Sequence, residues 1–167
     1  MKRLYVLCGA MGVGKTAAGK ALRDVLPDCA FLDGDWCWDM RPFRVTQTTK
    51  RVVLDNIAHV LNNFLTCGAF ENVVFCWVMH RREILSGVLD ALDTRGWDVR
   101  VTALVCSPEA LKARLAADVR AGVRDADVIR RALEYLPLYR ELGVPCLDVS
   151  ALSPGEAAAR IRGEGAR

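Results

Sequence analysis

The chain has 167 residues, of which 52% are hydrophobic and 26% are charged, a composition typical of a globular protein rather than a disordered or fibrous one. This length corresponds most simply to one domain, residues 1–167, and the formal net charge of +3 is too small to indicate a nucleic acid polymer as partner. Seven cysteines without a Cys-x-x-Cys pair give no metal or disulfide framework, and no apolar run approaches the roughly 18 residues of a membrane span. We therefore expect a reduced, cytoplasmic protein without a membrane partner, either a monomer or a homodimer.

Short apolar runs alternate with helical patterns from the start of the chain to its end. Buried strands are predicted at residues 4–8, 30–32, 72–79, 99–105 and 144–149. Helices are predicted at residues 15–26, 46–66, 82–94, 108–117, 128–142 (with a kink at Pro137) and 154–161. This alternation predicts an α/β fold in which helices cover both faces of a five-stranded parallel sheet. The last five residues, 163–167, are expected to be frayed.

The first apolar run leads into Gly9-Ala-Met-Gly-Val-Gly-Lys-Thr16, which fits the Walker A pattern. Glycines let successive backbone N–H groups face one concavity, Lys15 supplies a positive charge to the β- and γ-phosphates, and Thr16 offers a hydroxyl to Mg²⁺. The alternative is a glycine-rich turn with an incidental lysine, but the motif also requires the strand before it and the helix after it. The predicted nucleotide-binding residues are Gly9, Ala10, Met11, Gly12, Val13, Gly14, Lys15, Thr16 and Ala17.

Two carboxylates follow the second predicted strand, in Asp33-Gly34-Asp35. The carboxyl ends of strands face the ligand crevice in open α/β sheets. Beside a triphosphate, one carboxylate would hold Mg²⁺ through water, together with Thr16, and we assign this role to Asp33. The other would orient or deprotonate an acceptor hydroxyl, and the sequence leaves open whether Asp33 or Asp35 is that base. The alternative is an ordinary acidic turn.

An arginine-rich segment, residues 118–127, lies between two predicted helices. In a phosphotransferase such a segment serves as a lid, which we place at about residues 117–127. Gly122 would give it freedom to move, and Arg120 or Arg124 would cancel the charge that develops during phosphoryl transfer. A solvated loop is the alternative interpretation.

These motifs together resemble the small P-loop kinases, a group that includes shikimate, gluconate and adenylylsulfate kinases, nucleotide kinases and antibiotic-resistance phosphotransferases. The resemblance rests on Gly9–Thr16, Asp33-Gly34-Asp35, the arginine-rich segment and Pro137-Leu138-Tyr139. It implies the sheet order 2-3-1-4-5 and an Arg-rich lid before the penultimate helix. It also implies an adenine-contacting loop around residues 150–154, and Arg114 is the candidate for the adenine side of ATP.

The chain departs from this family at three places. Trp77-Val78-Met79-His80 stands where shikimate kinase has three glycines, and Tyr135 stands where it has a carboxylate-binding arginine, so shikimate is not the expected acceptor. The third strand also lacks the acidic residue of a Walker B motif. Magnesium is therefore expected to depend on Thr16, Asp33 and water, which argues against a motor-type ATPase.

In the family, the acceptor pocket forms after the second strand and at the end of the third. Trp36, Arg41 and Arg44 lie in the first of these regions, and His80 lies in the second. With Asp35 they form the predicted acceptor site, and they indicate a flat or partly apolar acceptor that also carries negative charge. The alternatives are that the tryptophans only pack a helix onto the sheet and that His80 has a capping or surface role.

The sequence therefore predicts a phosphotransferase that uses ATP and Mg²⁺ to phosphorylate a small-molecule acceptor. A nucleotide, a nucleoside or an antibiotic would fit the predicted acceptor site. The alternative is a nucleotide-binding regulatory NTPase that signals by loop ordering and has no small-molecule acceptor.

Overall fold

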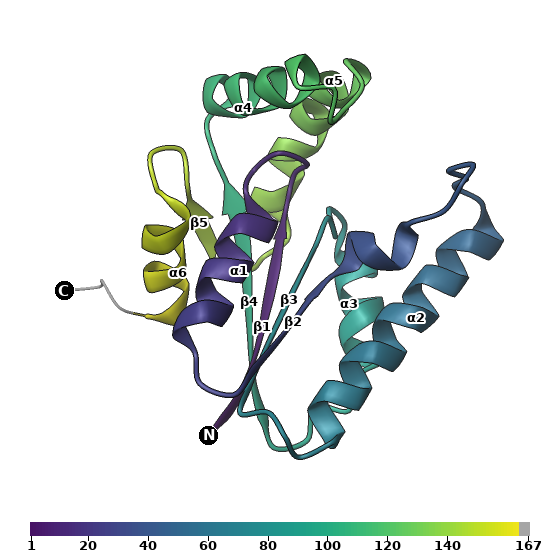
Figure 1. The fold of residues 1–167 in the computed structure, drawn as a ribbon, viewed down its shortest axis with the longest axis vertical. Coiled ribbons are helices and arrows are strands. Elements are labelled where there is room, and N and C mark those ends of the chain that lie inside the picture. The colour runs from purple at the N-terminus through teal and green to yellow at the C-terminus, as the bar shows by residue number, and fades with distance from the viewer. Residues whose placement is uncertain (164–167) are drawn as a thin grey trace.

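The five predicted apolar runs form one parallel sheet in the computed structural model, which describes residues 1–163 (Figure 1). The strand order β2-β3-β1-β4-β5 confirms the expected 2-3-1-4-5. β1 lies at the centre and pairs with both β3 and β4, and its residues Leu4 to Cys8 are fully buried. The strands are β1 (Lys2–Gly9), β2 (Cys29–Asp33), β3 (Asn72–Trp77), β4 (Trp97–Val105) and β5 (Cys146–Asp148).

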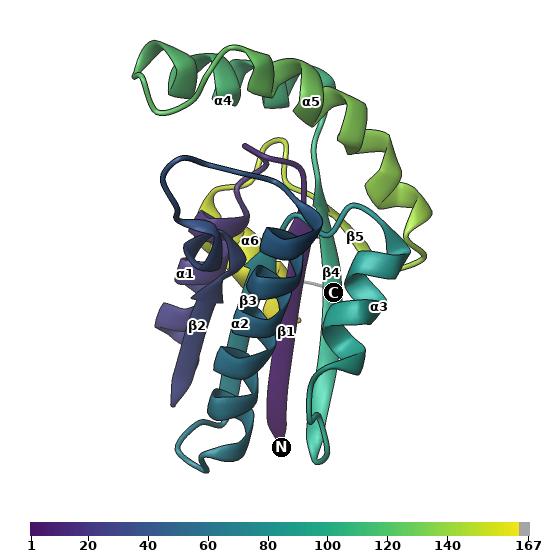
Figure 2. The same cartoon turned by 90° about the vertical axis from the view of Figure 1, so that its right-hand side faces the viewer.

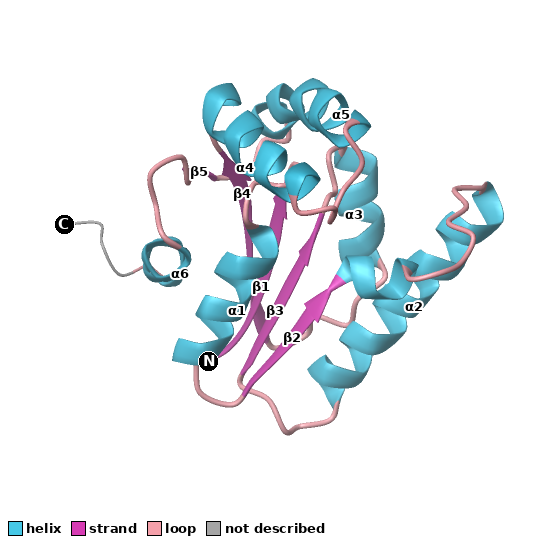
Figure 3. Ribbon diagram, turned by 45° about the horizontal axis from the view of Figure 1, so that its top comes forward, coloured by secondary structure: helices cyan, strands magenta, loops and turns pink. Residues whose placement is uncertain are grey.

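Helices cover both faces of this sheet, and a further pair crosses one end of it. α1 and α6 lie on one face, and α2 and α3 lie on the other (Figures 1 and 3). α4 and α5 cross the end at which the strands have their carboxyl termini (Figure 2). The helices are α1 (Lys15–Val25), α2 (Gln47–Thr66), α3 (Arg82–Asp90), α4 (Pro108–Arg120), α5 (Asp127–Tyr135) and α6 (Pro154–Arg162), with 3₁₀ turns η1 (Gly34–Trp38) and η2 (Leu136–Glu141).

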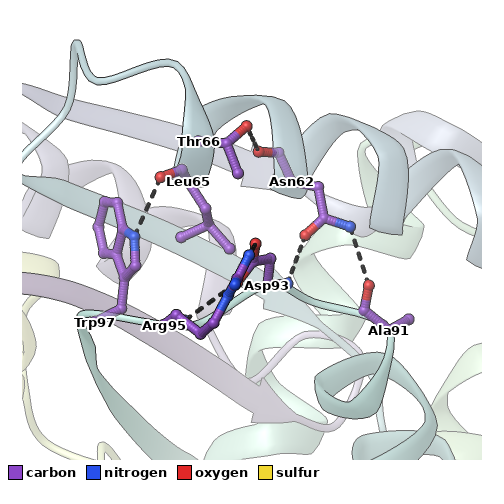
Figure 4. Close-up of polar contacts among 7 residues, drawn as sticks. All are labelled: Asn62, Leu65, Thr66, Ala91, Asp93, Arg95 and Trp97. Atoms are coloured by element: carbon purple, nitrogen blue, oxygen red, sulfur yellow. Dashed lines mark hydrogen bonds and ion pairs between the residues drawn. The ribbon is translucent and has the colours of Figure 1, made fainter.

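α3 ends four residues earlier than its apolar pattern predicts, because a side chain of α2 forms hydrogen bonds with the backbone there. The Asn62 side chain donates to the Ala91 carbonyl at 3.0 Å and accepts from the Asp93 backbone N–H at 2.7 Å (Figure 4). The Trp97 indole then donates to the Leu65 carbonyl at 3.2 Å, which fixes the start of β4 two residues before the predicted one. Each partner lies about thirty residues away in sequence, so local patterns carry no sign of these contacts.

α4 continues to Arg120, three residues beyond its predicted end. It closes with a Schellman motif in which Gly122, at φ +68°, donates to the Val119 carbonyl and Val123 donates to the Asp118 carbonyl. The predicted lid segment is therefore helical over its first residues, and the connection to α5 is 121–126. The predicted helix 128–142 with a kink at Pro137 is wrong in its second half, since α5 ends at Tyr135 and the 3₁₀ turn η2 follows.

The predicted fraying of residues 163–167 falls, from residue 164 onward, outside the described part of the chain. Gly163 adopts a left-handed conformation, at φ +97°, and caps α6. Within residues 1–163, no helix combines the length and the apolar character that crossing a membrane requires.

Candidate active site

The loop between β1 and α1 is a backbone cradle that requires glycine. Gly12 has φ +79° and Gly14 has φ +108°, conformations that L side chains rarely adopt. A Cβ on Gly12 would also lie 2.4 Å from Cδ2 of Leu115, so the loop packs directly against α4. No side chain caps the N-terminus of α1, and its first N–H groups are available to an anion.

Lys15 is buried inside this cradle. Its Nζ donates to the Ala10 carbonyl at 2.9 Å, and only 8% of the residue is exposed. Burial lowers the pKa of Lys15, and the nearby carboxylates Asp35 and Asp33 act in the opposite direction. Because a buried ammonium with one backbone acceptor is costly, the geometry fits an anion that would take over that hydrogen bond.

Asp33 lies beside Thr16, at the end of β2. The Thr16 hydroxyl donates to Oδ2 of Asp33 at 2.5 Å, and the Asp35 backbone N–H donates to Oδ1 at 3.0 Å. Burial raises the pKa of the Asp35 carboxyl, and the charge of Asp33 raises it further, while Lys15 and Arg124 oppose the shift. Thr16, Asp33 and Asp35 are thus brought together next to Lys15, as the sequence predicts.

These residues also fit a magnesium ion of the kind found with bound phosphates. Among residues 1–163, no group of three His, Cys, Asp or Glu side chains forms a metal cage. Mg²⁺ characteristically keeps water ligands and takes one or two protein oxygens plus phosphate oxygens. The Thr16 hydroxyl and the Asp33 carboxylate are such a pair of protein oxygens.

Cys76 is a neighbour of this pair that the sequence analysis did not select. It pairs in register with Asp33, on the adjacent strand. Burial raises the pKa of its thiol, and the negative charge of Asp33 raises it further, so the thiol stays protonated there. The missing acid of the third strand is the sequence signal that pointed to this position.

A cavity of about 240 Å³ lies on one side of the phosphate loop. Arg114 spans it: its guanidinium donates to the Val13 carbonyl at 2.8 Å and to the Val149 carbonyl at 2.7 Å, and thereby ties the loop to the end of β5. The cavity joins the predicted loop residues to most of the segment predicted to contact adenine. Its lining residues are Val13, Gly14, Ala17, Ala18, Leu104, Arg114, Val149, Leu152, Ser153, Pro154 and Ala157.

A larger cavity, of about 600 Å³, lies on the other side. Four of the predicted site residues line it: Met11, Asp35, His80 and Arg124. The remaining lining residues are Trp38, Phe43, Val45, Lys50, Leu54, Trp77, Val78, Met79, Ile84, Asp125, Val128 and Arg131.

Four residues predicted for the acceptor site or for phosphate transfer do not line this cavity. Trp36 is 54% exposed and sets its ring edge-on against Phe31 at 5.5 Å, while Arg41, Arg44 and Arg120 are exposed. Their roles in acceptor binding and phosphate transfer stay predictions.

His80 stacks on Tyr135, with ring centroids 4.1 Å apart and planes at 7°. Its Nδ1 is buried and has no hydrogen-bond partner among residues 1–163. Burial lowers the pKa of His80, and the charge of Arg81 lowers it further, so the imidazole is neutral at physiological pH. Tyr135, the departure from the shikimate kinase pattern, thus supports a residue of the cavity.

The sequence analysis missed the contributions of α2 and α5 to this cavity. The core stripe of α2 is formed by Val53, Ile57, Leu61 and Leu65, whereas Lys50 and Leu54 form a second stripe one position away. Leu54 is an apolar residue outside the core stripe, four positions after Lys50, and this spacing was the sequence signal for a second functional face of α2. α5 contributes Val128 and Arg131.

The comparisons with known proteins agree with this architecture. A family model described as an AAA domain matches residues 6–131, and no curated protein matches the sequence significantly. The chain is similar in structure to the tunicamycin resistance protein of Deinococcus radiodurans, with a TM-score of 0.71 and 17% identity over 98% of this chain and 95% of the other. It is also similar to a gluconokinase from Sinorhizobium meliloti 1021, with a TM-score of 0.68 and 20% identity over 96% of this chain and 92% of the other. A shikimate kinase from Acinetobacter baumannii is similar as well, with a TM-score of 0.66 and 21% identity over 97% of this chain and 92% of the other.

TM-scores of 0.66 to 0.71 establish the fold, and the family model covers most of the chain. The chain therefore belongs to the AAA-domain family of P-loop proteins and has the fold of the small P-loop kinases.

Proposed function

We propose that this protein is a kinase that uses ATP and Mg²⁺ to phosphorylate a small-molecule acceptor. The observation that carries the proposal is the position of the phosphate loop between two cavities. Val13 and Gly14 line the smaller cavity, whereas Met11 lines the larger one, together with Asp35. A nucleotide bound from the small side would therefore present its terminal phosphate toward the large side.

Each polar residue at this junction has a task that suits its chemistry. Lys15 would exchange its bond to the Ala10 carbonyl for phosphate oxygens, and Thr16 and Asp33 would hold the magnesium ion. Bound Mg²⁺ supplies neutralisation of phosphate charge. Asp35 lines the larger cavity and would accept the proton of the attacking hydroxyl, and its raised pKa suits that role. Arg124 lies close enough to influence both Lys15 and Asp35 electrostatically.

ADP release tests the proposal. The rate is measured with ATP and Mg²⁺ alone and then with nucleosides, nucleotides, and nucleoside or aminoglycoside antibiotics. A kinase releases ADP faster when its acceptor is present. Slow, steady release that is indifferent to every acceptor would favour the regulatory NTPase instead.

A further inference from the structure

The larger cavity has walls that are mainly apolar and aromatic. Its volume of about 600 Å³ lies within the range of sites for drug-sized ligands, roughly 300–1,000 Å³. The apolar walls come from several parts of the chain, and most of their residues from η1 and the loop after it, α2, the end of β3, and α5. Trp38, Phe43, Leu54, Trp77 and Val128 represent them.

Two of the three cationic side chains that line the cavity form ion pairs within the protein. Arg124 pairs with Asp118 at 3.2 Å, and Arg131 pairs with Asp127 at 2.9 Å. Lys50 is exposed to solvent at the start of α2, and Asp125 adds a negative charge. The arginines that had suggested an anionic acceptor, Arg41 and Arg44, are not part of the lining.

Asp35 is the polar group of the cavity that we assign to the acceptor's reacting hydroxyl. It lies on the side of Lys15, which places that hydroxyl at the same end. His80 also lines the cavity, where its ring stacks on Tyr135, but its Nδ1 is buried out of reach of a ligand. A polyhydroxylated acid would bury several more hydroxyls against walls that are mainly apolar and aromatic.

We infer, on the basis of the proposed kinase function, that the acceptor is an uncharged, mostly apolar ring compound of drug-like size that carries the hydroxyl to be phosphorylated. The apolar walls bind its ring system, and Asp35 receives the hydroxyl. Sugar acids such as gluconate and shikimate belong to the class that this cavity disfavours.

Binding is tested by isothermal titration calorimetry with 2-(2-naphthyl)ethanol as probe, compared with gluconate and shikimate, in the absence of ATP. The naphthyl alcohol is expected to bind at least ten-fold more tightly than either acid, about 1.4 kcal/mol. Equal or tighter binding of an acid, or no binding of the naphthyl alcohol, would overturn the inference.

Two variants on α2 show whether the probe occupies this cavity. Leu54 lines it and is 37% exposed, whereas Val52 lies outside it and is 45% exposed. Leu54→Glu is expected to weaken naphthyl alcohol binding at least ten-fold, and Val52→Glu to leave it unchanged. Equal effects of the two substitutions would contradict the assignment.

These binding experiments do not depend on turnover, so the two proposals fail separately. Tight binding of the naphthyl alcohol, without phosphorylation of any acceptor, would support the inferred ligand class and contradict the proposed kinase function. Phosphorylation of gluconate without naphthyl alcohol binding would support the kinase function and contradict the inferred ligand class.

Discussion

Lys15 is a buried charge that is costly for the fold and that we assign to phosphate binding. Its ammonium is withdrawn from water and has one carbonyl, that of Ala10, as its hydrogen-bond acceptor. Such a charge contributes little to stability, because the desolvation penalty offsets a single hydrogen bond. A phosphate bound there, as we propose, would compensate a charge that the protein alone solvates poorly.

Lys15→Met should abolish the stabilisation of the protein by ATP without lowering the melting temperature of the ligand-free protein. For the native protein, ATP at a hundred times its Kd should stabilise by about 2.7 kcal/mol. Differential scanning fluorimetry with and without MgATP measures both quantities, and Lys20→Met, an exposed position of α1, is the matched control. An undiminished ATP-induced shift in Lys15→Met would show that this loop does not bind the phosphates.

Asp35 should set the acid limb of the pH–rate profile. Its pKa is raised by burial and by Asp33, so the base becomes protonated, and kcat/KM falls, at a higher pH than an ordinary aspartate would give. Asp35→Asn should lower kcat/KM by about 10²-fold or more and remove that limb, while Asp39→Asn should change neither. An acid limb that persists in Asp35→Asn would assign the base elsewhere.

The same shift has a consequence for stability. A carboxyl whose pKa is higher in the folded state binds more protons there than in the unfolded chain, so its contribution to stability is lost as pH rises from its ordinary pKa through its raised pKa. Stability of the native protein should therefore fall over this acidic window relative to Asp35→Asn, and denaturant titrations at several pH values measure the difference.

At the scale of elements, local pattern predicts what each segment is, while distant contacts decide where it ends. The phosphate loop and the strand–helix alternation depend on neighbours in sequence, and both were predicted. The C-terminal end of α3 and the start of β4 depend on contacts with Asn62 and Leu65 of α2. These residues lie too far away in sequence for a local pattern to reveal them. The extension of α4 was not predicted for a different reason, because its arginines were interpreted as loop residues. Arginine favours helix, and Gly122 ends this helix as its C-terminal cap.

The segment between α4 and α5 should act through Arg124 more than through Arg120. Arg124 lines the larger cavity and acts electrostatically on Lys15 and Asp35, whereas Arg120 is exposed at the end of α4. Arg124→Ala should therefore lower kcat by about two to three orders of magnitude, and Arg120→Ala by much less. Steady-state kinetics of both variants decide the point.

Arg130→Ala serves as the control for this comparison, because Arg130 lies on α5 and, within residues 1–163, forms ion pairs only with the surface acids Asp127 and Glu134. A loss in Arg120→Ala that equals or exceeds that in Arg124→Ala would contradict the assignment of the lid arginine.

In the molecule as a whole, the predicted site residues lie at the end of the parallel sheet where the strands have their carboxyl termini. The phosphate loop, the Asp33–Asp35 pair and His80 all follow the carboxyl ends of strands, and these positions were predictable from sequence because each motif is short and adjacent to its strand. The larger cavity differs, since its walls come from the phosphate loop, η1, α2, the end of β3, α3, α5 and the connection before α5. Only the folded chain brings these parts together, which is why Leu54 and Val128 were not predicted from the sequence, whereas Lys15 was.

The central claim is that the protein transfers the terminal phosphate of ATP to an acceptor hydroxyl. The most direct measurement follows the label of [γ-³²P]ATP in the presence of MgCl₂ and each candidate acceptor, including 2-(2-naphthyl)ethanol. We predict that label appears covalently on an acceptor with the native protein and not with Lys15→Met. Label recovered only as inorganic phosphate, at a rate that no acceptor changes, would contradict the claim.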